Sequence, residues 1–328
     1  MKLALPLKLI CLLLPLTMTC MTSAARAADG AGNYPNRPIR FIAPFVAGGP
    51  SDLMARLLGQ RLSEAWGQPV IVDNRGSAGG VVGFEIGAKA PPDGYTLLLA
   101  TSAGLTINPV VYLKLPYDPE RDYLPVTQVT SGAYVLAIHP GVPAKSLTEF
   151  IAHAKTRPGQ LNYATTGTNN LLAAELLNHM AGIKTIGISY KGTGQAVNAL
   201  LGGEVQMFVI SPLVGLPHIN AGKLRALGTT GLKRSKGMTD IPTIAETLPG
   251  YEQIVWHCIL LPAKTPKPIA DKLTREFVRI IKLPDIQERF SSQGLEPIGS
   301  PPETVTALIK QELVLSAKIA KQIGLKPQ

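Results

Sequence analysis

The amino-acid sequence predicts an α/β protein with two doubly wound α/β domains and a cleft between them. Apolar strand segments alternate with helical segments along most of the chain, which predicts parallel sheets covered by helices on both faces. In each half, one strand runs into a glycine-rich turn that opens a helix, at 39–52 and 161–170. The two series of elements are about equal in size, so we expect one domain for each.

The first 27 residues are expected to be a cleavable signal peptide. Lys2 and Lys8 precede an apolar run over 9–21, and Ala25-Arg26-Ala27 supplies small residues at −3 and −1. Pro15 breaks this run, which is shorter than the ~20 residues of a membrane-spanning helix. Export is therefore favoured over a membrane anchor, and lipidation at Cys20 is the minor alternative.

The first series begins with a strand whose helix opens after Gly49-Pro50-Ser51, and the turn Pro91-Pro92-Asp93-Gly94 precedes its third strand. We expect strand 39–44, helix 51–66, strand 70–73, helix 80–90 and strand 95–100, then strands near 124–129 and 134–138.

The second series begins at a capping box, Ser146-Leu147-Thr148-Glu149, which starts a helix that ends near 156. We expect strand 161–165, helix 169–181, strand 185–189, helix 194–202, strand 205–210, helix 212–221 and strand 224–229.

The C-terminal part is expected to contain strand 252–261 and three helices, each opened by proline at Pro266, Pro284 and Pro301-Pro302. Crossings between the domains are expected near 128–137 and 248–256, so that these helices pack back on the first domain. The expected division is domain 1 over 35–130 and 250–328, and domain 2 over 131–249.

The two glycine-rich turns form the candidate binding site. The first amides of a helix lack partners, and the helix dipole adds about half a unit of positive charge there. Right-handed crossovers place such turns along one edge of each sheet. Two turns in different halves therefore predict a cleft that holds a carboxylate from both sides.

Each candidate residue also has an ordinary structural role. Gly48 and Gly49 can serve a tight turn that needs positive φ, and threonine and asparagine can cap the helix after Gly167. Capping is the favoured role of Asp52, because its carboxylate would repel an anionic ligand.

The charge and the motifs exclude several other functions. The net charge of +10 falls to +7 without Lys2, Lys8 and Arg26; it is spread thinly, and 5% aromatic residues are too few for nucleic-acid stacking platforms. Common hydrolase, zinc and nucleotide motifs are absent from the sequence, and its histidines lack metal-ligand spacing. We expect no catalytic residue, no metal, no cofactor and no nucleic-acid partner.

Cys258 is the single cysteine that remains after the signal peptide. It lies in the apolar run 254–261, which predicts a buried strand. Neighbouring strand residues face opposite sides and burial raises a thiol pKa, so His257 and Cys258 are not expected to form a catalytic pair.

Ordered sequence blocks from residue 35 to about 310 resemble the Bug family, the periplasmic solute-binding receptors of tripartite tricarboxylate transport systems. The blocks are Pro44-Phe45 with Gly48-Gly49, Asp52 and Ala55-Arg56, Asn74-Arg75-Gly76-Ser77-Ala78-Gly79-Gly80, Ala90-Pro91-Pro92-Asp93-Gly94-Tyr95, Leu115-Pro116-Tyr117-Asp118-Pro119, Asn162-Tyr163-Ala164 with Gly167, Tyr190-Lys191-Gly192, Leu201-Gly202-Gly203-Glu204-Val205 and Gly222-Lys223-Leu224-Arg225-Ala226-Leu227.

The resemblance implies a periplasmic binding protein of the type II architecture that closes on a small carboxylate. It maps the ligand-holding loops onto the same two turns, and Ser102 is expected as a third contact on that edge. Tyr190 is a further candidate for the pocket, with the core as its ordinary alternative. The expected ligand-binding residues are Phe45, Val46, Ala47, Gly48, Gly49, Ser102, Thr165, Thr166, Gly167, Thr168, Asn169, Asn170 and Tyr190.

The chain departs from the family pattern at three places. Relatives often carry an aspartate at the end of the strand where this chain reads Met207-Phe208-Val209-Ile210-Ser211, so an amino-acid ligand is less expected than a plain organic acid. Leu171-Leu172 replaces a His-Leu pair, and Cys258 replaces glycine.

The resemblance implies a monomer that delivers its ligand to a membrane permease. Two alternatives stay open: a periplasmic ligand sensor of a two-component system, and a secreted hydrolase. The sequence does not identify the ligand.

Overall fold

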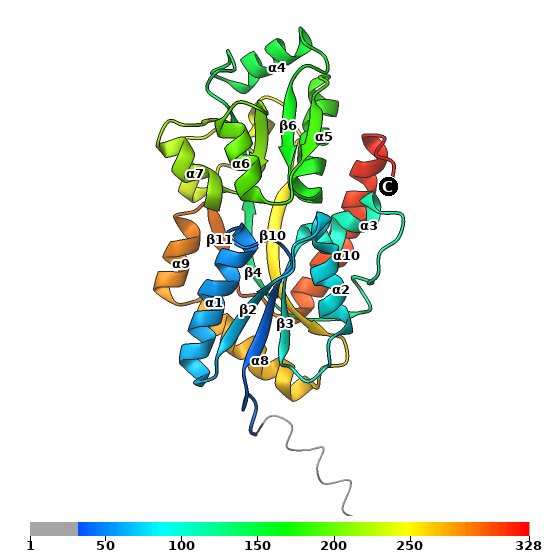
Figure 1. The fold of residues 1–328 in the computed structure, drawn as a ribbon, viewed down its shortest axis with the longest axis vertical. Coiled ribbons are helices and arrows are strands. Elements are labelled where there is room, and N and C mark those ends of the chain that lie inside the picture. Colours follow the sequence, from blue (N-terminus) through cyan, green and yellow to red (C-terminus); the bar gives the residue numbers. More distant parts are fainter. Residues whose placement is uncertain (1–31, 328) are drawn as a thin grey trace, which may run out of the picture.

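Two α/β units lie one above the other in the computed structural model, which describes residues 32–327 (Figure 1). The predicted signal peptide lies outside the described residues. Each unit is built on one sheet, and helices cover the faces of both sheets (Figure 1). The predicted α/β class with two units is confirmed. None of the helices in 32–327 is both long enough and apolar enough to cross a membrane.

The lower unit in Figure 1 contains a six-stranded sheet in the order β11-β4-β10-β3-β1-β2. β1 lies between β2 and β3 and runs parallel to both, whereas β10 runs antiparallel to its neighbours β3 and β4. The strands are β1 (Ile39–Ala43), β2 (Val70–Asn74), β3 (Thr96–Thr101), β4 (Tyr123–Ala133), β10 (Ile254–Pro262) and β11 (Leu295–Pro297).

The upper unit contains a five-stranded sheet in the order β7-β6-β8-β5-β9. β6 runs parallel to β7 and β8, and β5 runs antiparallel to β8 and β9. The strands are β5 (Val135–Ile138), β6 (Asn162–Thr165), β7 (Ile186–Ser189), β8 (Met207–Ile210) and β9 (Arg225–Thr229).

The prediction of wholly parallel sheets is wrong, because β5, β10 and β11 run antiparallel to their neighbours. β5 and β10 are the strands that the chain enters directly after leaving the other sheet. A helical crossover within one sheet forces a parallel return. That constraint does not act on a strand that arrives from the other sheet.

The helices agree with the predicted positions except at the segment after β3. There, a π-helical segment η3 (Ala103–Ile107) and the short α3 (Asn108–Val111) were not predicted. All of η3 is buried, so it shows no amphipathic pattern. The helices are α1 (Pro50–Trp66), α2 (Val81–Lys89), α4 (Leu147–Lys155), α5 (Thr168–Ala181), α6 (Thr193–Leu201), α7 (Pro212–Asn220), α8 (Lys267–Ile281), α9 (Pro284–Ser291) and α10 (Pro302–Gln322), with 3₁₀ turns at Ala78–Gly80, Lys236–Met238 and Ile244–Glu246.

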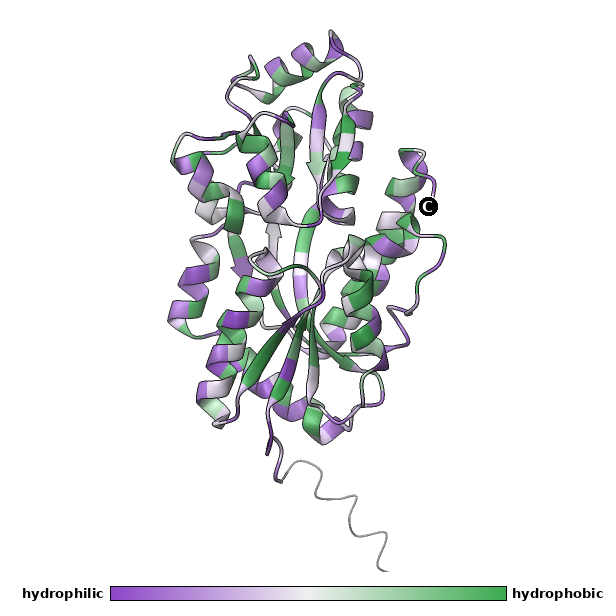
Figure 2. Ribbon diagram, viewed as in Figure 1, coloured by the Kyte–Doolittle hydropathy of each residue, from purple (hydrophilic) through white to green (hydrophobic). Residues whose placement is uncertain are grey.

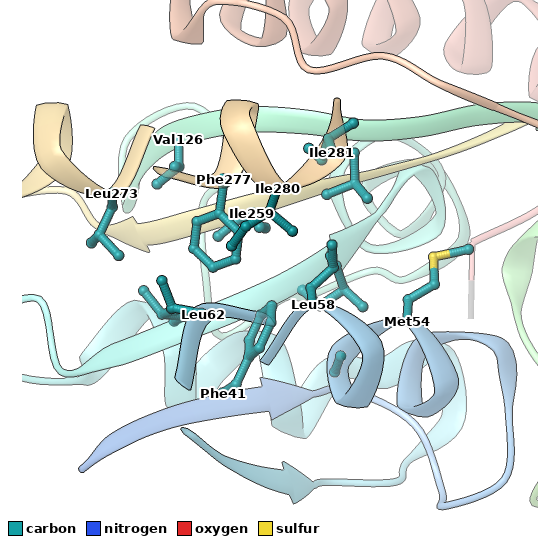
Figure 3. Packing of buried hydrophobic residues seen from close by; sticks show 14 of the residues in the cluster. Phe41, Met54, Leu58, Leu62, Val126, Ile259, Leu273, Phe277, Ile280 and Ile281 are labelled. Atoms are coloured by element: carbon teal, nitrogen blue, oxygen red, sulfur yellow. The ribbon is translucent and has the colours of Figure 1, made fainter. Parts of the chain in front are cut away.

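The main core of the lower unit lies where α1 and α8 pack on one face of the sheet (Figure 3). Phe41 of β1 and Phe277 of α8 approach with ring centroids 6.0 Å apart, and Leu58 and Leu62 of α1 are fully buried beside them. The helices expose polar faces and turn apolar faces inward (Figure 2). Each such buried side chain contributes about 1.5–3 kcal/mol through the hydrophobic effect.

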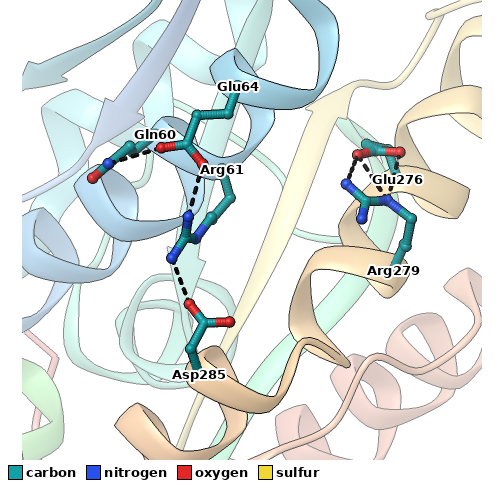
Figure 4. A network of polar contacts seen from close by, with 6 residues as sticks. All are labelled: Gln60, Arg61, Glu64, Glu276, Arg279 and Asp285. Carbon is teal, nitrogen blue, oxygen red and sulfur yellow. Dashed lines mark hydrogen bonds and ion pairs between the residues drawn. The ribbon is translucent and has the colours of Figure 1, made fainter.

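Charged side chains add a surface link between α1 and α9 (Figure 4). Arg61 contacts Glu64 at 2.8 Å on its own helix and Asp285 at 2.5 Å on α9. A separate pair joins Arg279 to Glu276 within α8. Because these side chains are partly exposed, each pair is worth about 0–1 kcal/mol.

The C-terminal helix α10 contacts both units, whereas the sequence predicted packing on the first domain alone. Val305 and Ile309 lie in a core cluster of the lower unit. Ile319 and the adjoining Ile323 pack against the core of the upper unit, and also against a small cluster that contains Leu172 of α5. The last turns of α10 therefore bridge the two units.

Leu273→Ala is expected to destabilise the protein by about 2–5 kcal/mol, because Leu273 is fully buried in the core between α1 and α8. Leu113→Ala is the matched control; Leu113 is 78% exposed, and its truncation should change stability by about 0.5 kcal/mol or less. Urea unfolding followed by circular dichroism measures both. Equal losses in the two variants would contradict this description of the core.

Candidate ligand-binding site

The chain crosses between the two sheets in two places. β4 ends at Ala133 and β5 begins at Val135, so Tyr134 alone joins them. The return runs from the end of β9 at Thr229 to the start of β10 at Ile254. The two crossings are close together in the elements they join, since β4 and β10 are neighbours in the lower sheet.

A cavity of about 70 Å³ lies between the units, next to these crossings. Its lining comes from both sheets and from the crossings. The lining residues are Phe45, Pro50, Ser51, Thr101, Ala103, Tyr134, Thr166, Gly167, Asn169, Asn170, Thr193, Phe208, Ser211, Val255 and His257.

Four helices begin at this cavity. Pro50 and Ser51 open α1, Gly167 is the N-cap of α5, Thr193 opens α6, and Ser211 is the N-cap of α7. Pro50 and Pro212, the first residues of α1 and α7, have no N–H. The other first-turn amides have no acceptor within the helix, and each helix dipole is positive at this end. The cavity therefore collects hydrogen-bond donors and positive potential from four directions.

The second glycine-rich turn offers mainly backbone donors. The first intrahelical bond of α5 runs from Leu171 N–H to Gly167 O at 3.2 Å, so the amides of 168–170 have no intrahelical partner. Its side chains are committed to the protein itself: Thr165 Oγ1 donates to Gly167 O, Thr166 Oγ1 to Asn170 Oδ1, and Asn170 Nδ2 to Val209 O.

The first glycine-rich turn differs from the expectation at Gly48. Its N–H donates to Asp52 Oδ2 at 2.9 Å, so this amide is not available to a ligand in this structure. Asp52 also pairs with Arg56 at 2.9 Å. Burial alone would raise the pKa of Asp52, but the Gly48 hydrogen bond and Arg56 hold it below the ordinary value.

Asp52 thus stabilises the turn, in keeping with the structural role favoured for it. The N–H groups of Ser51 and Asp52 precede the first intrahelical bond of α1, from Leu53 N–H to Gly49 O at 3.1 Å. These two amides replace Gly48 as the candidate donors of the first turn.

The tip of the first turn contacts the upper unit directly. A Cβ at Gly192 would lie 2.4 Å from Cγ2 of Val46, so only glycine allows this approach. A Cβ at Gly49 would lie 3.8 Å from Thr193 Oγ1. Val46, Ala47 and Gly48 are otherwise exposed. The tip of the turn therefore lies against the upper unit and outside the cavity lining, whereas Phe45 lines the cavity.

Two polar side chains predicted as ligand contacts join the units to each other. Ser102 Oγ donates to Asn169 Oδ1 at 3.2 Å, and Thr168 Oγ1 donates to Asn108 Oδ1 at 2.8 Å. Both hydrogen bonds run between the segment after β3 and the start of α5. Tyr190 packs against an apolar cluster of the upper unit.

Five of the predicted residues line the cavity, and the others are not among its lining residues. The lining ones are Phe45, Thr166, Gly167, Asn169 and Asn170. Those outside the lining are Val46, Ala47, Gly48, Gly49, Ser102, Thr165, Thr168 and Tyr190.

Sequence reasoning missed several polar lining residues, including Ser51, Thr101, Tyr134, Ser211 and His257. Thr101 ends β3, and Ser211 directly follows β8, so a systematic search of strand ends would have found both. His257 belongs to an apolar strand that was predicted as buried core. Cys258 beside it lies in an apolar cluster, and burial raises the pKa of its thiol.

The cavity lining carries no formal charge at neutral pH. Its residues include no lysine, arginine, aspartate or glutamate. Burial lowers the pKa of His257 to about 4, so the imidazole is neutral, and burial raises the pKa of Tyr134. In the described part of the chain, no cluster of three or more histidine, cysteine, aspartate or glutamate residues could hold a metal ion.

Comparison with known proteins gives concordant similarities. A family model described as "Tripartite tricarboxylate transporter family receptor" matches residues 54–325. Protein BugT of Bordetella pertussis is 36% identical over 311 residues, which cover 93% of this chain and 95% of BugT.

Solved structures of the same kind superpose well on this chain. The R. palustris protein Rpa4515, described with adipate, has a TM-score of 0.88 and 30% identity, and the match covers 90% of this chain and 100% of that one. MatC (Rpa3494) from Rhodopseudomonas palustris, described with bound malate, has a TM-score of 0.83 and 28% identity, covering 87% of this chain and 99% of that one.

Gly192→Ala is expected to disfavour the contact between the first turn and α6, because the added methyl group would overlap Val46. Such overpacking costs about 1–3 kcal/mol. Gly194→Ala is the matched control, since a Cβ there meets nothing within 4 Å. Small-angle X-ray scattering should give a larger radius of gyration for Gly192→Ala than for the control. Identical scattering from the two variants would rule out this contact as a determinant of closure.

Proposed function

The chain belongs to the tripartite tricarboxylate transporter receptor family, and on this premise we propose that it captures a small organic acid between its two units and delivers it to a membrane permease. We propose further that it is exported to the periplasm by its signal peptide, acts as a monomer and carries out no catalysis. Rpa4515 is described with adipate and MatC with malate, which supports an organic acid as ligand.

The observation that carries this proposal is the convergence of four helix N-termini on a cavity without charged side chains. A carboxylate placed there would accept hydrogen bonds from first-turn amides of both units. Hydrogen bonds to a charged group contribute about 1.5–3 kcal/mol each. Two or three that form only on closure can offset a few kcal/mol that favour the open form.

Closure requires two bodies, and we propose that these are domain 1 over 35–130 and 250–328, and domain 2 over 131–249. The membership of the two sheets supports this division, since β5 to β9 form one sheet and all other strands the second. The positions of Tyr134 and of the segment between β9 and β10 support a two-stranded hinge. α10 would then remain attached to domain 1 and slide against domain 2.

The proposal is tested by calorimetry of the purified protein against mono-, di- and tricarboxylates. At least one acid is expected to bind with micromolar or tighter affinity, and mass spectrometry should recover it unchanged. Uniform absence of binding across the panel would contradict a receptor for organic acids. Conversion of the bound acid into a product would favour a hydrolase instead.

Thr166→Asp is expected to weaken binding of the best acid at least tenfold, because it adds a negative charge in the cavity just before the N-terminus of α5. The same charge favours the helix, so the melting temperature should not fall. Thr166→Asn is the neutral control of nearly equal size, expected to stay within about fivefold of the original affinity, since it leaves the amides unopposed. Equal affinities of the two variants would show that the helix terminus does not bind the anion.

A further inference from the structure

Thr101 is a buried hydroxyl that the fold leaves without a partner. It is the last residue of β3, is 4% exposed and lines the cavity. Its Oγ1 makes no hydrogen bond within the described residues. Most buried polar side-chain atoms have a partner, so an unpaired one beside a cavity points to a group that the cavity receives.

His257 lies directly across from Thr101, because the two residues are partners in the register of β3 and β10. Such antiparallel partners project from the same face of the sheet, with Cβ atoms about 4.5–5.5 Å apart. His257 also lines the cavity. The two side chains are therefore neighbours on one wall.

The tautomer of His257 follows from Thr130. Thr130 Oγ1 lies 3.0 Å from Nδ1 of His257, and this hydroxyl is fully buried with no other hydrogen bond. If Nδ1 carried the proton, the Thr130 hydrogen would be buried without an acceptor. Thr130 therefore donates to Nδ1, and the imidazole carries its proton on Nε2.

We propose that Thr101 and His257 form a subsite that donates two hydrogen bonds, from Oγ1–H and Nε2–H, to an acceptor oxygen of the ligand. This inference rests on the proposed function. It assigns the ligand to organic acids with a second acceptor group, a carboxylate or a carbonyl, besides the carboxylate held by the helix N-termini.

The same wall disfavours two other classes of ligand. An ammonium group needs acceptors and a negative partner, and the cavity lining includes no aspartate or glutamate. A simple alkyl chain would leave both donors unpaired in a buried place, which costs affinity. The subsite therefore separates bifunctional acids from both amino acids and plain monocarboxylates.

The test compares acids of matched length in calorimetry: succinate, butyrate and 4-aminobutyrate, and adipate, 5-oxohexanoate, hexanoate and 6-aminohexanoate. With the unmodified protein, the dicarboxylate or the oxo acid should bind at least tenfold more tightly than the monocarboxylate and the amino acid of its set. Preference for the dicarboxylate identifies the acceptor as a carboxylate, and preference for the oxo acid identifies a carbonyl. Preference for a monocarboxylate or an amino acid would overturn the proposal.

Variants of Thr101 and His257 test whether these two side chains cause the preference for bifunctional acids. Thr101→Val removes the hydroxyl at constant shape and should weaken binding of the preferred bifunctional acid about tenfold or more, whereas the monocarboxylate should bind equally or more tightly, since one unpaired donor is gone. Thr101→Ser keeps the hydroxyl, so its affinity for the preferred bifunctional acid should stay within about threefold of that of the unmodified protein. His257→Leu should weaken binding of the preferred bifunctional acid by a similar factor, because it removes the second donor. Because Thr101→Val also removes an unpaired buried hydroxyl, the unliganded protein should melt at the same or a higher temperature.

The outcomes separate this inference from the proposed function. If Thr101→Val leaves the preference for bifunctional acids intact, or weakens the binding of all acids equally, the proposed subsite is contradicted. The protein would still bind carboxylates in that case. If no acid binds the unmodified protein, the proposed function itself fails.

Discussion

The site depends on one constraint: an anion is to be held where no cationic side chain is present. The amides at the starts of α1 and α5 can hold it only if both units bring them to the same cavity. Neither glycine-rich turn encloses the cavity alone, because the lining comes from both sheets and from the crossings between them. In the proposed function, binding and closure are thus parts of one process, since the donors of both units reach one ligand only when the units meet.

The proposed hinge and the cavity share residues. Tyr134 is the single residue between β4 and β5, and its hydroxyl accepts a hydrogen bond from Asn169 of α5 at 3.1 Å. His257 lies near the start of β10, the strand that receives the second crossing. A group bound at the cavity therefore contacts the chain where it passes from one unit to the other.

Features that depend on local patterns could be predicted from the sequence. The turns after β1 and β6 were predicted because glycine, proline and hydroxyl residues mark a strand that leads into a helix. The role of Gly48 could not be predicted, since its amide donates a hydrogen bond to the side chain of Asp52.

The antiparallel direction of β5 and β10, and the pairing of Thr101 with His257, depend on which strands become neighbours. Leu171 and Leu172 depart from the family pattern, and the structure accounts for them through packing at the cluster between the units.

The bridge made by α10 has a thermodynamic consequence. Ile319, Ile323 and Leu172 meet in an apolar cluster that joins the units, so separating the units would expose this surface to water. Apolar association near room temperature is driven mainly by the entropy of water and weakens on cooling. In the proposed closure, a lower temperature would therefore shift the balance toward the form in which this cluster is separated.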